Sequence, residues 1–393
     1  MQIIRGSWVK DYIEVNSAFL ATLPRNFKIN LGVETIDAKR NIRTGKIILS
    51  KFHLPISQTV LVKRDNTDLS IGPVLGFMAR GVDSKTVARF KHYFVQTYEG
   101  ILFVFDEEAV YNKQFWGYLP DKNQWLHLEL PKPSYIFDRT YPSTDTVKNN
   151  LPQSIFYNAV TQFAKIDLAN LLQKNNVEVP EFHSGYLPDY LDNYLLFYLK
   201  PDRGAFGKGI FVVRKLKDGF QIFNGSDGTF EFCNREQLIK LLHDLSTANY
   251  LLQEGLISQK YQGQPFDIRV HTLIDPFPRV VFIGVRLSKY DFLFTSTPRR
   301  LLPGEKVIDS STITRLKEVI INAIDIIKNH YGLFVELSFD VVITETGEFQ
   351  IIDVNGKSTR THPALLNYNI DQYFRAPYKL ARYLFVNGQL LND

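Results

Sequence analysis

Residues 194–215 read YLLFYLKPDRGAFGKGIFVVRK, two apolar runs on either side of a centre rich in glycine and lysine. A P-loop needs the pattern G-x-x-x-x-G-K-[ST] followed by a helix, but only two residues separate Gly204 from Gly207, and a β-branched run follows. The dinucleotide fingerprint G-x-G-x-x-G also opens a helix and is excluded on the same grounds. The stretch therefore predicts a β-hairpin with a glycine-rich tip.

Such a tip suits anion binding, because glycine lets backbone N–H groups approach phosphate oxygens without a Cβ in the way. Lys200 ends the incoming strand, where its ammonium would point toward the same phosphates. A surface hairpin whose lysines are simply solvated explains these residues equally well. The hairpin by itself leaves both interpretations open.

A second stretch, VELSFDVVITETGEFQIIDVNGKSTR at 335–360, predicts two strands joined by a turn at 344–348. The hairpin would set Asp340 and Asp353 side by side, and Asn355, two residues on, would face the same side. Aspartates inside apolar strands are costly to bury unless they are paired or bound to a metal. Three converging oxygen ligands favour Mg²⁺, which keeps waters and is completed by substrate phosphates, over a purely structural pair.

The composition is that of a globular protein. The chain has 393 residues, which suggests two or three domains, with 45% hydrophobic and 22% charged residues. One cysteine, Cys233, excludes an intrachain disulfide and a thiolate metal cluster. No apolar run approaches the roughly 20 residues of a membrane span and no signal peptide is evident, so we expect a cytoplasmic protein. The net charge is +5, and the sequence contains no block rich in lysine or arginine, which argues against a nucleic-acid partner.

Strand and turn signals predict three units along the chain. Residues 1–70 are expected to form a β-rich module of short strands, and residues 71–150 a smaller βαβ unit. Residues 151–393 form the largest unit, in which strands recur between helices.

Some elements within these units are predicted individually. We expect a strand over 27–36, irregular chain around one strand over 120–146, and a helix over 155–174. Two further helices are expected over 311–330 and 371–385.

The chain resembles the ATP-grasp superfamily in three features taken together. These are a strand that ends in lysine, a glycine-rich hairpin, and an acidic hairpin that ends in D-x-N. The chain is most similar to the YheC/YheD-type branch, which is associated with endospore-forming bacteria. The motifs that carry the resemblance are SIGPVLGFMARG (70–81), YLKPDRGAFGKGI (198–210), LLQEGL (251–256), FDIRV (266–270) and IIDVNGKSTR (351–360). The resemblance covers nearly the whole chain. It implies a multidomain α+β and α/β fold, with a two-lobed ATP-grasp domain over 151–393 that encloses ATP and Mg²⁺.

The same resemblance implies roles for individual residues. Lysines would contact the phosphates, residues 204–209 would form a mobile lid, and a hinge would meet the adenine. The expected nucleotide-binding residues are Lys165, Lys200, Gly204, Gly207, Lys208, Gly209, Gln253, Glu254, Gly255, Leu256 and Arg360. The expected metal ligands are Asp340, Asp353 and Asn355, and the expected catalytic residues are Lys200, Arg269 and Arg286.

Three positions depart from the superfamily pattern. Gln253 and Asp353 stand where glutamate is usual, and Ser358-Thr359 replaces the usual Pro-Gly, which leaves the substrate side undefined. Glu254 and Gln259 are the candidates for the ribose-binding residue.

The arginines on the apolar strands have two interpretations. Arg269 and Arg286 could face solvent, but an arginine on such a strand is usually paired, and a phosphate is a good partner. Asp267 is expected on the opposite face of the strand from Arg269, in a structural role.

The resemblance implies an ATP-dependent carboxylate–amine ligase, in which a γ-phosphate activates a carboxylate as an acylphosphate that an amine then attacks. The substrates would be small molecules or peptides, with a link to the spore coat or sporulation. Two alternatives remain: a nucleotide-binding structural or assembly protein of the spore coat with little turnover, and an ATP-dependent kinase of a small molecule. Substrate specificity is expected in residues 287–310 and in the two N-terminal units.

Overall fold

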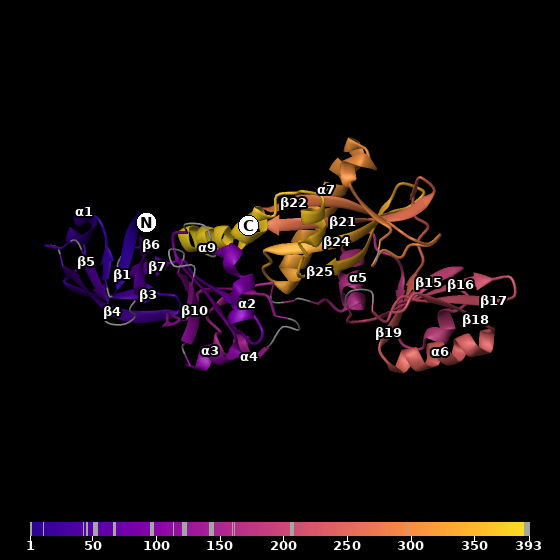
Figure 1. Cartoon of the computed structure of the whole chain (residues 1–393), viewed down its shortest axis with the longest axis horizontal. Helices are drawn as coiled ribbons and strands as arrows, with labels where there is room; N and C mark the ends of the chain where they lie inside the picture. Colours follow the sequence, from indigo (N-terminus) through magenta and orange to yellow (C-terminus); the bar gives the residue numbers. More distant parts are fainter. Residues whose placement is uncertain are drawn as a thin grey trace.

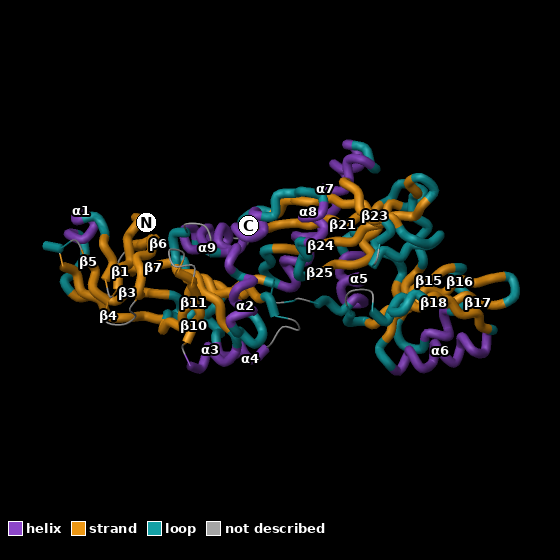
Figure 2. The backbone as a smooth tube through the Cα atoms, viewed as in Figure 1, coloured by secondary structure: helices purple, strands orange, loops and turns teal. Residues whose placement is uncertain are grey.

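The computed structural model describes residues 2–10, 12–41, 43–44, 46–49, 54–65, 68–94, 98–112, 114–119, 124–140, 145–158, 160, 162–204, 208–296 and 298–388. These residues form an elongated molecule, with the N-terminal strands at one end and the sheet that contains β15–β18 at the other (Figure 1). Strands make up most of its regular structure (Figure 2). No helix in the described ranges is long and apolar enough to cross a membrane.

The first sheet is a closed barrel with the strand order β1-β2-β5-β4-β3-β7-β6. Its strands are β1 (Gln2–Lys10), β2 (Tyr12–Glu14), β3 (Asn26–Leu31), β4 (Glu34–Asn41), β5 (Lys46–Leu49), β6 (Leu54–Asp65) and β7 (Asp68–Gly72), with helix α1 (Ser17–Ala21) after β2. The strand predicted over 27–36 is in fact most of the β3–β4 hairpin, in which Leu31 pairs with Glu34 across a two-residue turn. Closure removes the exposed strand edges that an open sheet would have.

The second sheet has the order β11-β10-β9-β8-β12-β13. Its strands are β8 (Val74–Met78), β9 (Ile101–Phe105), β10 (Gln114–Leu119), β11 (Gln124–Glu129), β12 (Tyr135–Asp138) and β13 (Ile155–Tyr157). Strands β8 and β9 are parallel, and helix α2 (Ser84–Arg89) with the 3₁₀ segment η1 (Lys91–Tyr93) lies between them in the chain. This is the βαβ arrangement that the sequence predicts. Helices α3 (Glu107–Asn112) and α4 (Asp145–Asn150) complete the unit.

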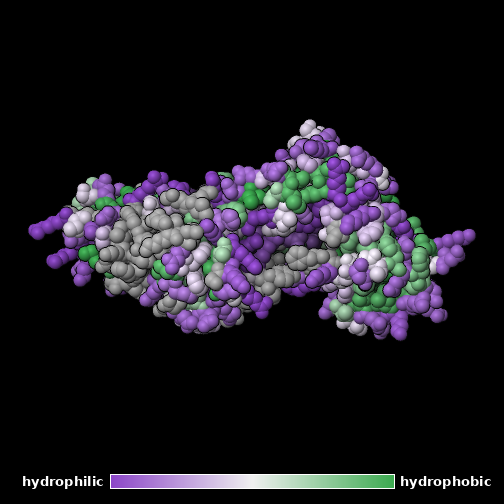
Figure 3. Space-filling view, viewed as in Figure 1, coloured by the Kyte–Doolittle hydropathy of each residue, from purple (hydrophilic) through white to green (hydrophobic). Residues whose placement is uncertain are grey.

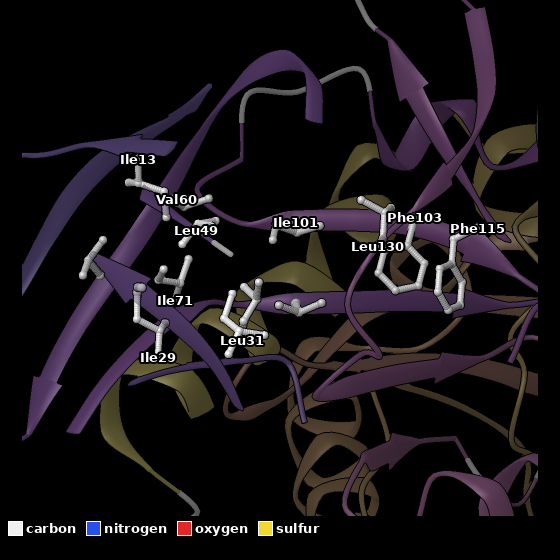
Figure 4. Close-up of a cluster of buried hydrophobic side chains, with 14 of the residues drawn as sticks. Ile13, Ile29, Leu31, Leu49, Val60, Ile71, Ile101, Phe103, Phe115 and Leu130 are labelled. Carbon is white, nitrogen blue, oxygen red and sulfur yellow. The ribbon is translucent and has the colours of Figure 1, made fainter. Parts of the chain in front are cut away.

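One hydrophobic cluster joins the barrel to the second sheet. Ile13, Ile29 and Val60 from the barrel belong to the same buried cluster as Phe103 and Phe115 from β9 and β10 (Figure 4). The two units therefore share a core. Where one unit ends and the next begins, near residues 70 and 150, stays a prediction.

Two of the predicted elements differ from the structure. The helix predicted over 155–174 is the strand β13 followed, after a break, by helix α5 (Lys165–Lys174). Residues 155–157, Ile-Phe-Tyr, are β-prone, and β13 pairs with β12 in parallel at the sheet edge. Asn158 then adopts a positive φ of 57°, which no helix interior allows. The region 120–146 contains two strands, β11 and β12, rather than one.

The third sheet has the order β14-β19-β15-β16-β17-β18. Its strands are β14 (Phe182–His183), β15 (Leu196–Pro201), β16 (Phe211–Leu216), β17 (Gly219–Asn224), β18 (Thr229–Cys233) and β19 (Tyr250–Glu254). Helix α6 (Arg235–Thr247) buries Leu238, Leu242 and Leu245 in one cluster with the sheet residues Phe197 and Val213. The short segment η3 (Leu187–Tyr190) belongs to this lobe.

The fourth sheet has the order β23-β22-β21-β24-β25, with β20 paired to β21. Its strands are β20 (Lys260–Tyr261), β21 (Gln264–Ile274), β22 (Pro278–Leu287), β23 (Arg300–Pro303), β24 (Glu336–Ile343) and β25 (Phe349–Asn355). Leu337, Phe339 and Val341 alternate along β24 and pack with helices α5 and α7 (Ser310–Tyr331). The other face of the sheet is left for polar side chains.

The C-terminal helices return to the second sheet. After η4 (Gly304–Lys306) and the fourth sheet come α8 (Thr361–Leu365) and α9 (Asp371–Asn387). Tyr373, Phe374 and Leu380 of α9 share a buried cluster with Phe77 and Phe137 of the second sheet. The largest unit is therefore packed against the βαβ unit by its last helix (Figure 1).

Candidate active site

A cavity of about 760 Å³ lies between the third and fourth sheets. The surface is hollowed near the middle of the molecule, where hydrophilic side chains gather (Figure 3). Most of the predicted site residues line the cavity. They are Lys165, Lys200, Gly204, Lys208, Gln253, Glu254, Leu256, Arg269, Arg286, Asp340, Asp353 and Asn355.

Two lysines line the cavity from different elements, Lys200 from β15 and Lys165 from the start of α5. Lys200 is near the end of β15, is 8% exposed, and burial lowers the pKa of its ammonium to about 8. Nearby Lys165 lowers this pKa further, while Asp353 opposes the shift. Lys165 begins α5 and donates to the carbonyl oxygens of Asp202 at 3.3 Å and Gly204 at 3.4 Å. The two ammonium groups give this part of the cavity a positive potential that suits phosphates.

The predicted hinge, residues 253–256, spans the end of β19 and the two residues after it. Gln253 is buried and its Oε1 accepts no hydrogen bond within the described part of the chain. The Gly255 N–H donates to Leu196 O, and a Cβ on Gly255 would lie 2.5 Å from that oxygen, so only glycine fits there. The N–H of Leu256 has no partner among the described residues. Leu256 packs with Leu293 and Ile352, which makes an apolar slot beside these free polar groups.

The glycine-rich stretch is the predicted antiparallel hairpin, in which Leu199 pairs with Phe211. Gly204 and Lys208 line the cavity. Gly209 is outside its wall, has a φ of +71° and donates its N–H to Ser226 Oγ. Gly207 belongs to residues 205–207, outside the described residues, so the expected lid stays a prediction.

The fourth sheet presents a row of buried ion pairs to the cavity. Arg286 Nε donates to Asp267 at 2.8 Å, its Nη2 lies 2.9 Å from Asp340, and Arg269 Nε approaches Asp340 Oδ1 to 2.5 Å. Thr295 also donates to Asp267. Asp267 was expected on the opposite face from Arg269, and this is wrong, because residues two apart on a strand share a face.

These pairs set the charge of the carboxylates. Burial alone would raise the pKa of Asp340, but the guanidinium groups of Arg269 and Arg286 more than offset it and hold the pKa below its ordinary value. Burial raises the pKa of Asp267 in spite of Arg286. The wall is therefore close to neutral where the two arginines face the two aspartates.

The predicted metal ligands meet as the hairpin implies. Asp340 pairs with Asp353 in register, and Asn355 Nδ2 donates to Asp353 Oδ2 at 3.1 Å. A register shift follows this pair, so Ile352 and Asp353, although adjacent, both line the cavity. Burial raises the pKa of Asp353, and no ion pair holds its carboxylate among the described residues.

This donor set fits Mg²⁺. The described residues contain no group of three or more His, Cys, Asp or Glu that could hold a metal by themselves. The carboxylate of Asp353 is half-buried and forms no ion pair among the described residues, and the amide group of Asn355 lies beside it. Hard oxygen donors in this small number suit an ion that completes its shell with water and phosphate.

Sequence reasoning missed the far end of the cavity, which is lined by Arg139, Lys357, Ser358 and His362. Arg139 follows β12 directly, at the carboxyl end of a parallel strand, where ligands often bind in α/β sheets. Its position at the end of a parallel strand could therefore have identified Arg139 as a candidate site residue from the sequence. The other three lie in and just after the quoted motif IIDVNGKSTR.

Arg360 lies elsewhere. Its guanidinium bonds to Tyr93 Oη and to Glu336 at 3.3 Å, and it stacks 4.8 Å from the ring centre of Phe374. The side chain connects η1, the fourth sheet and α9, outside the cavity wall. Gly255, one of the hinge residues, is also outside the wall.

The two α+β lobes, with a cavity between their sheets, define an ATP-grasp protein. The model of the family described as YheC/D like ATP-grasp matches residues 155–384, and the chain belongs to this family. The resemblance and the fold class expected from the sequence are thus confirmed.

The chain is also similar to individual proteins. The chain is 25% identical over 378 residues to the endospore coat-associated protein YheD of Bacillus subtilis strain 168, covering 84% of this chain and 82% of YheD. It shares its fold with the ATP-grasp ligase PsnB in complex with a precursor variant, Mg and ADP, at a TM-score of 0.50 and 13% identity over 79% of this chain and 98% of PsnB. The VanG D-Ala:D-Ser ligase of Enterococcus faecalis gives a TM-score of 0.49 and 11% identity, over 78% of this chain and 98% of VanG.

Proposed function

We propose that this chain is an ATP- and Mg²⁺-dependent ligase that joins a carboxylate to an amine and releases ADP and phosphate. The observation that carries the proposal is the convergence, in one cavity, of two lysines, two arginines and a half-buried aspartate that forms no ion pair among the described residues. These are the groups needed to bind a nucleoside triphosphate and to offset charge at the phosphoryl group being transferred.

The base of the nucleotide fits the apolar slot at the hinge. Adenine carries an exocyclic amino donor and a ring acceptor. Among the described residues, Gln253 Oε1 is a buried acceptor without a partner, and the Leu256 N–H has no acceptor. The phosphates would then extend along Lys165 and Lys200 toward the carboxylates of the fourth sheet.

Asp353 and Asn355, with Asp340 behind them, would hold Mg²⁺. When bound, the ion would neutralise phosphate charge and orient the phosphates. Arg269 and Arg286 already neutralise Asp340 in part, so they also position the carboxylate that faces the ion.

The chemistry needs no nucleophile from the protein. A carboxylate oxygen of the donor substrate attacks the γ-phosphorus, the bond to the β-bridging oxygen breaks, and ADP leaves with an acylphosphate remaining. The amine nitrogen of the acceptor then attacks the acyl carbon, the C–O bond to phosphate breaks, and the amine proton is lost as the amide forms. The protein positions both substrates and excludes water from the acylphosphate.

Turnover tests the proposal directly. The full chain is incubated with ATP, Mg²⁺ and pools of carboxylic acids and amines, and ADP release is measured. We expect release with at least one pool, and a loss of about a hundredfold or more in Lys200→Met and Asp353→Asn, with Lys240→Met on the exposed face of α6 as the matched control. ADP release at background with every pool contradicts the proposal, and a stable phosphoester product would indicate a kinase instead.

A second candidate function rests on the similarity to YheD, an endospore coat-associated protein. The chain would then bind a nucleotide as a coat component with little turnover. Calorimetry with ATP and Mg²⁺ separates the two functions. Binding that Asp353→Ala abolishes, without phosphate release in any pool, favours the coat component.

A further inference from the structure

Residues 357–362, which include the loop after β25 and the first two residues of α8, carry several unsatisfied polar atoms. Lys357 Nζ, Ser358 Oγ, Arg360 Nε and His362 Nδ1 are all buried and have no hydrogen-bond partner within the described ranges. Lys357, Ser358 and His362 also line the cavity. Buried polar groups in native proteins are nearly always bonded, so a cluster of free ones in a cavity wall indicates a ligand that bonds them.

The charges around this segment leave an excess of one positive charge. Arg139 and Arg360 share the fully buried Glu336, which leaves one of the two guanidinium charges uncompensated. Asp138 is the carboxylate whose charge acts most strongly on Lys357, but the two side chains form no ion pair. Asp138 Oδ1 instead accepts hydrogen bonds from Thr140. Burial lowers the pKa of His362 to about 4, so the imidazole is neutral at pH 7.

We propose that this end of the cavity binds a carboxylate that does not react, with Lys357 as its cationic partner and Arg139 and Ser358 beside it. The inference rests on the proposed ligase function and names the substrate class. Arg139 pairs with Glu336, whereas Arg269 and Arg286 pair with Asp340, four residues further along β24. The reacting carboxylate would lie on the Asp340 side. At least one substrate therefore carries a second carboxylate, either as an amino-acid acceptor or as a dicarboxylic donor.

A binding experiment tests the inference without turnover. Crystals of the full chain with ADP and Mg²⁺ are soaked in 4-bromobenzoate or in 4-bromobenzamide, its neutral counterpart, and the bromine is located by its anomalous signal. We expect ordered benzoate with its carboxylate at Lys357, no ordered benzamide there, and no ordered benzoate in crystals of Lys357→Met. Equal occupancy by acid and amide, or benzoate bound only at Arg269 and Arg286, overturns the inference.

Turnover identifies which substrate carries the carboxylate. ADP release is compared for amino acids against their amides as acceptors, and for dicarboxylic against monocarboxylic acids as donors. In Lys357→Met we expect KM for the substrate with the extra carboxylate to rise about tenfold or more, with kcat changed only a few-fold and the uncharged counterpart unaffected. Lys240→Met, an exposed lysine on α6, is the matched control.

The outcomes separate this inference from the function on which it rests. If Lys357 only balances Asp138, Lys357→Met lowers the thermal midpoint of unfolding without changing the preference for acids over amides, and the inference is wrong. If the wild-type protein turns over no pool, the ligase function fails, and the bromobenzoate soak still decides whether the carboxylate site exists.

Discussion

Burial determines the charge state of the ionisable side chains in the cavity. Arg286 is 4% exposed and Asp267 is 1% exposed, so each would be costly to bury alone. Removing one partner of a buried ion pair typically costs about 3–5 kcal/mol, because it strands the other charge. The pair therefore holds Arg286 in place against Asp340 before any substrate binds. Such a preorganised wall suits charge that develops at a transferring phosphoryl group.

Lys200 makes nucleotide binding depend on pH. Its pKa in the free protein is about 8, below the ordinary 10.5, so the fraction of charged ammonium falls as pH rises through 8. Phosphate binding needs the charged form, so we expect the affinity for Mg²⁺-ATP to fall above pH 8 by up to about tenfold per pH unit. Calorimetric titrations between pH 7.5 and 9.5 measure this.

Lys200→Met is the control for that pH dependence. Its affinity should be weak at every pH and vary much less across the same range, because the titrating ammonium is gone. A wild-type affinity that does not change between pH 7.5 and 9.5 would show that Lys200 does not contact the phosphates.

At the scale of elements, the antiparallel pair β15–β19 builds the nucleotide side of the cavity. Register places Tyr198 beside Gln253 and Lys200 beside Leu251, so one pair of strands carries both the lysine and the hinge. On the opposite side, the register shift in β24–β25 turns Ile352 toward the slot and Asp353 toward the metal position. These two registers therefore form the two sides of the part of the cavity proposed to bind the nucleotide.

Gly255 controls how closely the hinge approaches β15. In Gly255→Ala the new Cβ would lie 2.5 Å from Leu196 O, so the strands must separate. We expect a loss of about 1–3 kcal/mol in unfolding free energy and weaker nucleotide binding, measured by thermal melts and calorimetry.

Gly204→Ala is the matched substitution for folding. A Cβ there meets only Pro201, at the ordinary distance of 3.4 Å. We expect its thermal midpoint to equal that of the wild type. Equal midpoints for both variants would mean that the hinge tolerates a wider separation.

At the scale of the whole molecule, the chain returns on itself to complete the cavity. Helix α9 packs on the second sheet, and this brings the loop after β12 beside the segment 357–362. The far end of the cavity therefore draws Arg139 from the second unit and Lys357 from the largest one. The βαβ unit is part of the active site wall and not only a neighbour of it.

Substitution of Arg360 tests the contact between the largest unit and the βαβ unit. Its guanidinium joins Tyr93, Glu336 and Phe374, from three parts of the molecule, so Arg360→Met should lower the unfolding free energy by about 2 kcal/mol or more. The affinity for ADP should change less than about twofold, since the side chain lies outside the cavity wall. Thermal melts and calorimetry measure both effects.

Arg315→Met, which removes an exposed arginine near Phe349, is the control for that variant. It should leave both quantities nearly unchanged. A large loss of ADP affinity in Arg360→Met with an unchanged melting midpoint would instead support the nucleotide contact that the family resemblance implies.

Much of the cavity could be predicted because it depends on short-range patterns. The period of two along a strand places Asp353 and Asn355 on one face, and a short turn places Asp340 beside them. The glycine-rich hairpin follows from the β-branched run after it. These relations span few residues, so the amino-acid sequence contains all the information that they need.

The sequence alone therefore determined the family, the two hairpins and the facing carboxylates, since local periodicity and turn chemistry decide them. Only the tertiary structure showed that Arg286 pairs with Asp267, that Arg360 lies outside the cavity wall, and that Arg139 lines it. Arg139 and Lys357 are more than 200 residues apart in the chain, and no local pattern links them. Their meeting depends on how α9 packs the largest unit against the βαβ sheet, which is a property of the complete hydrophobic core.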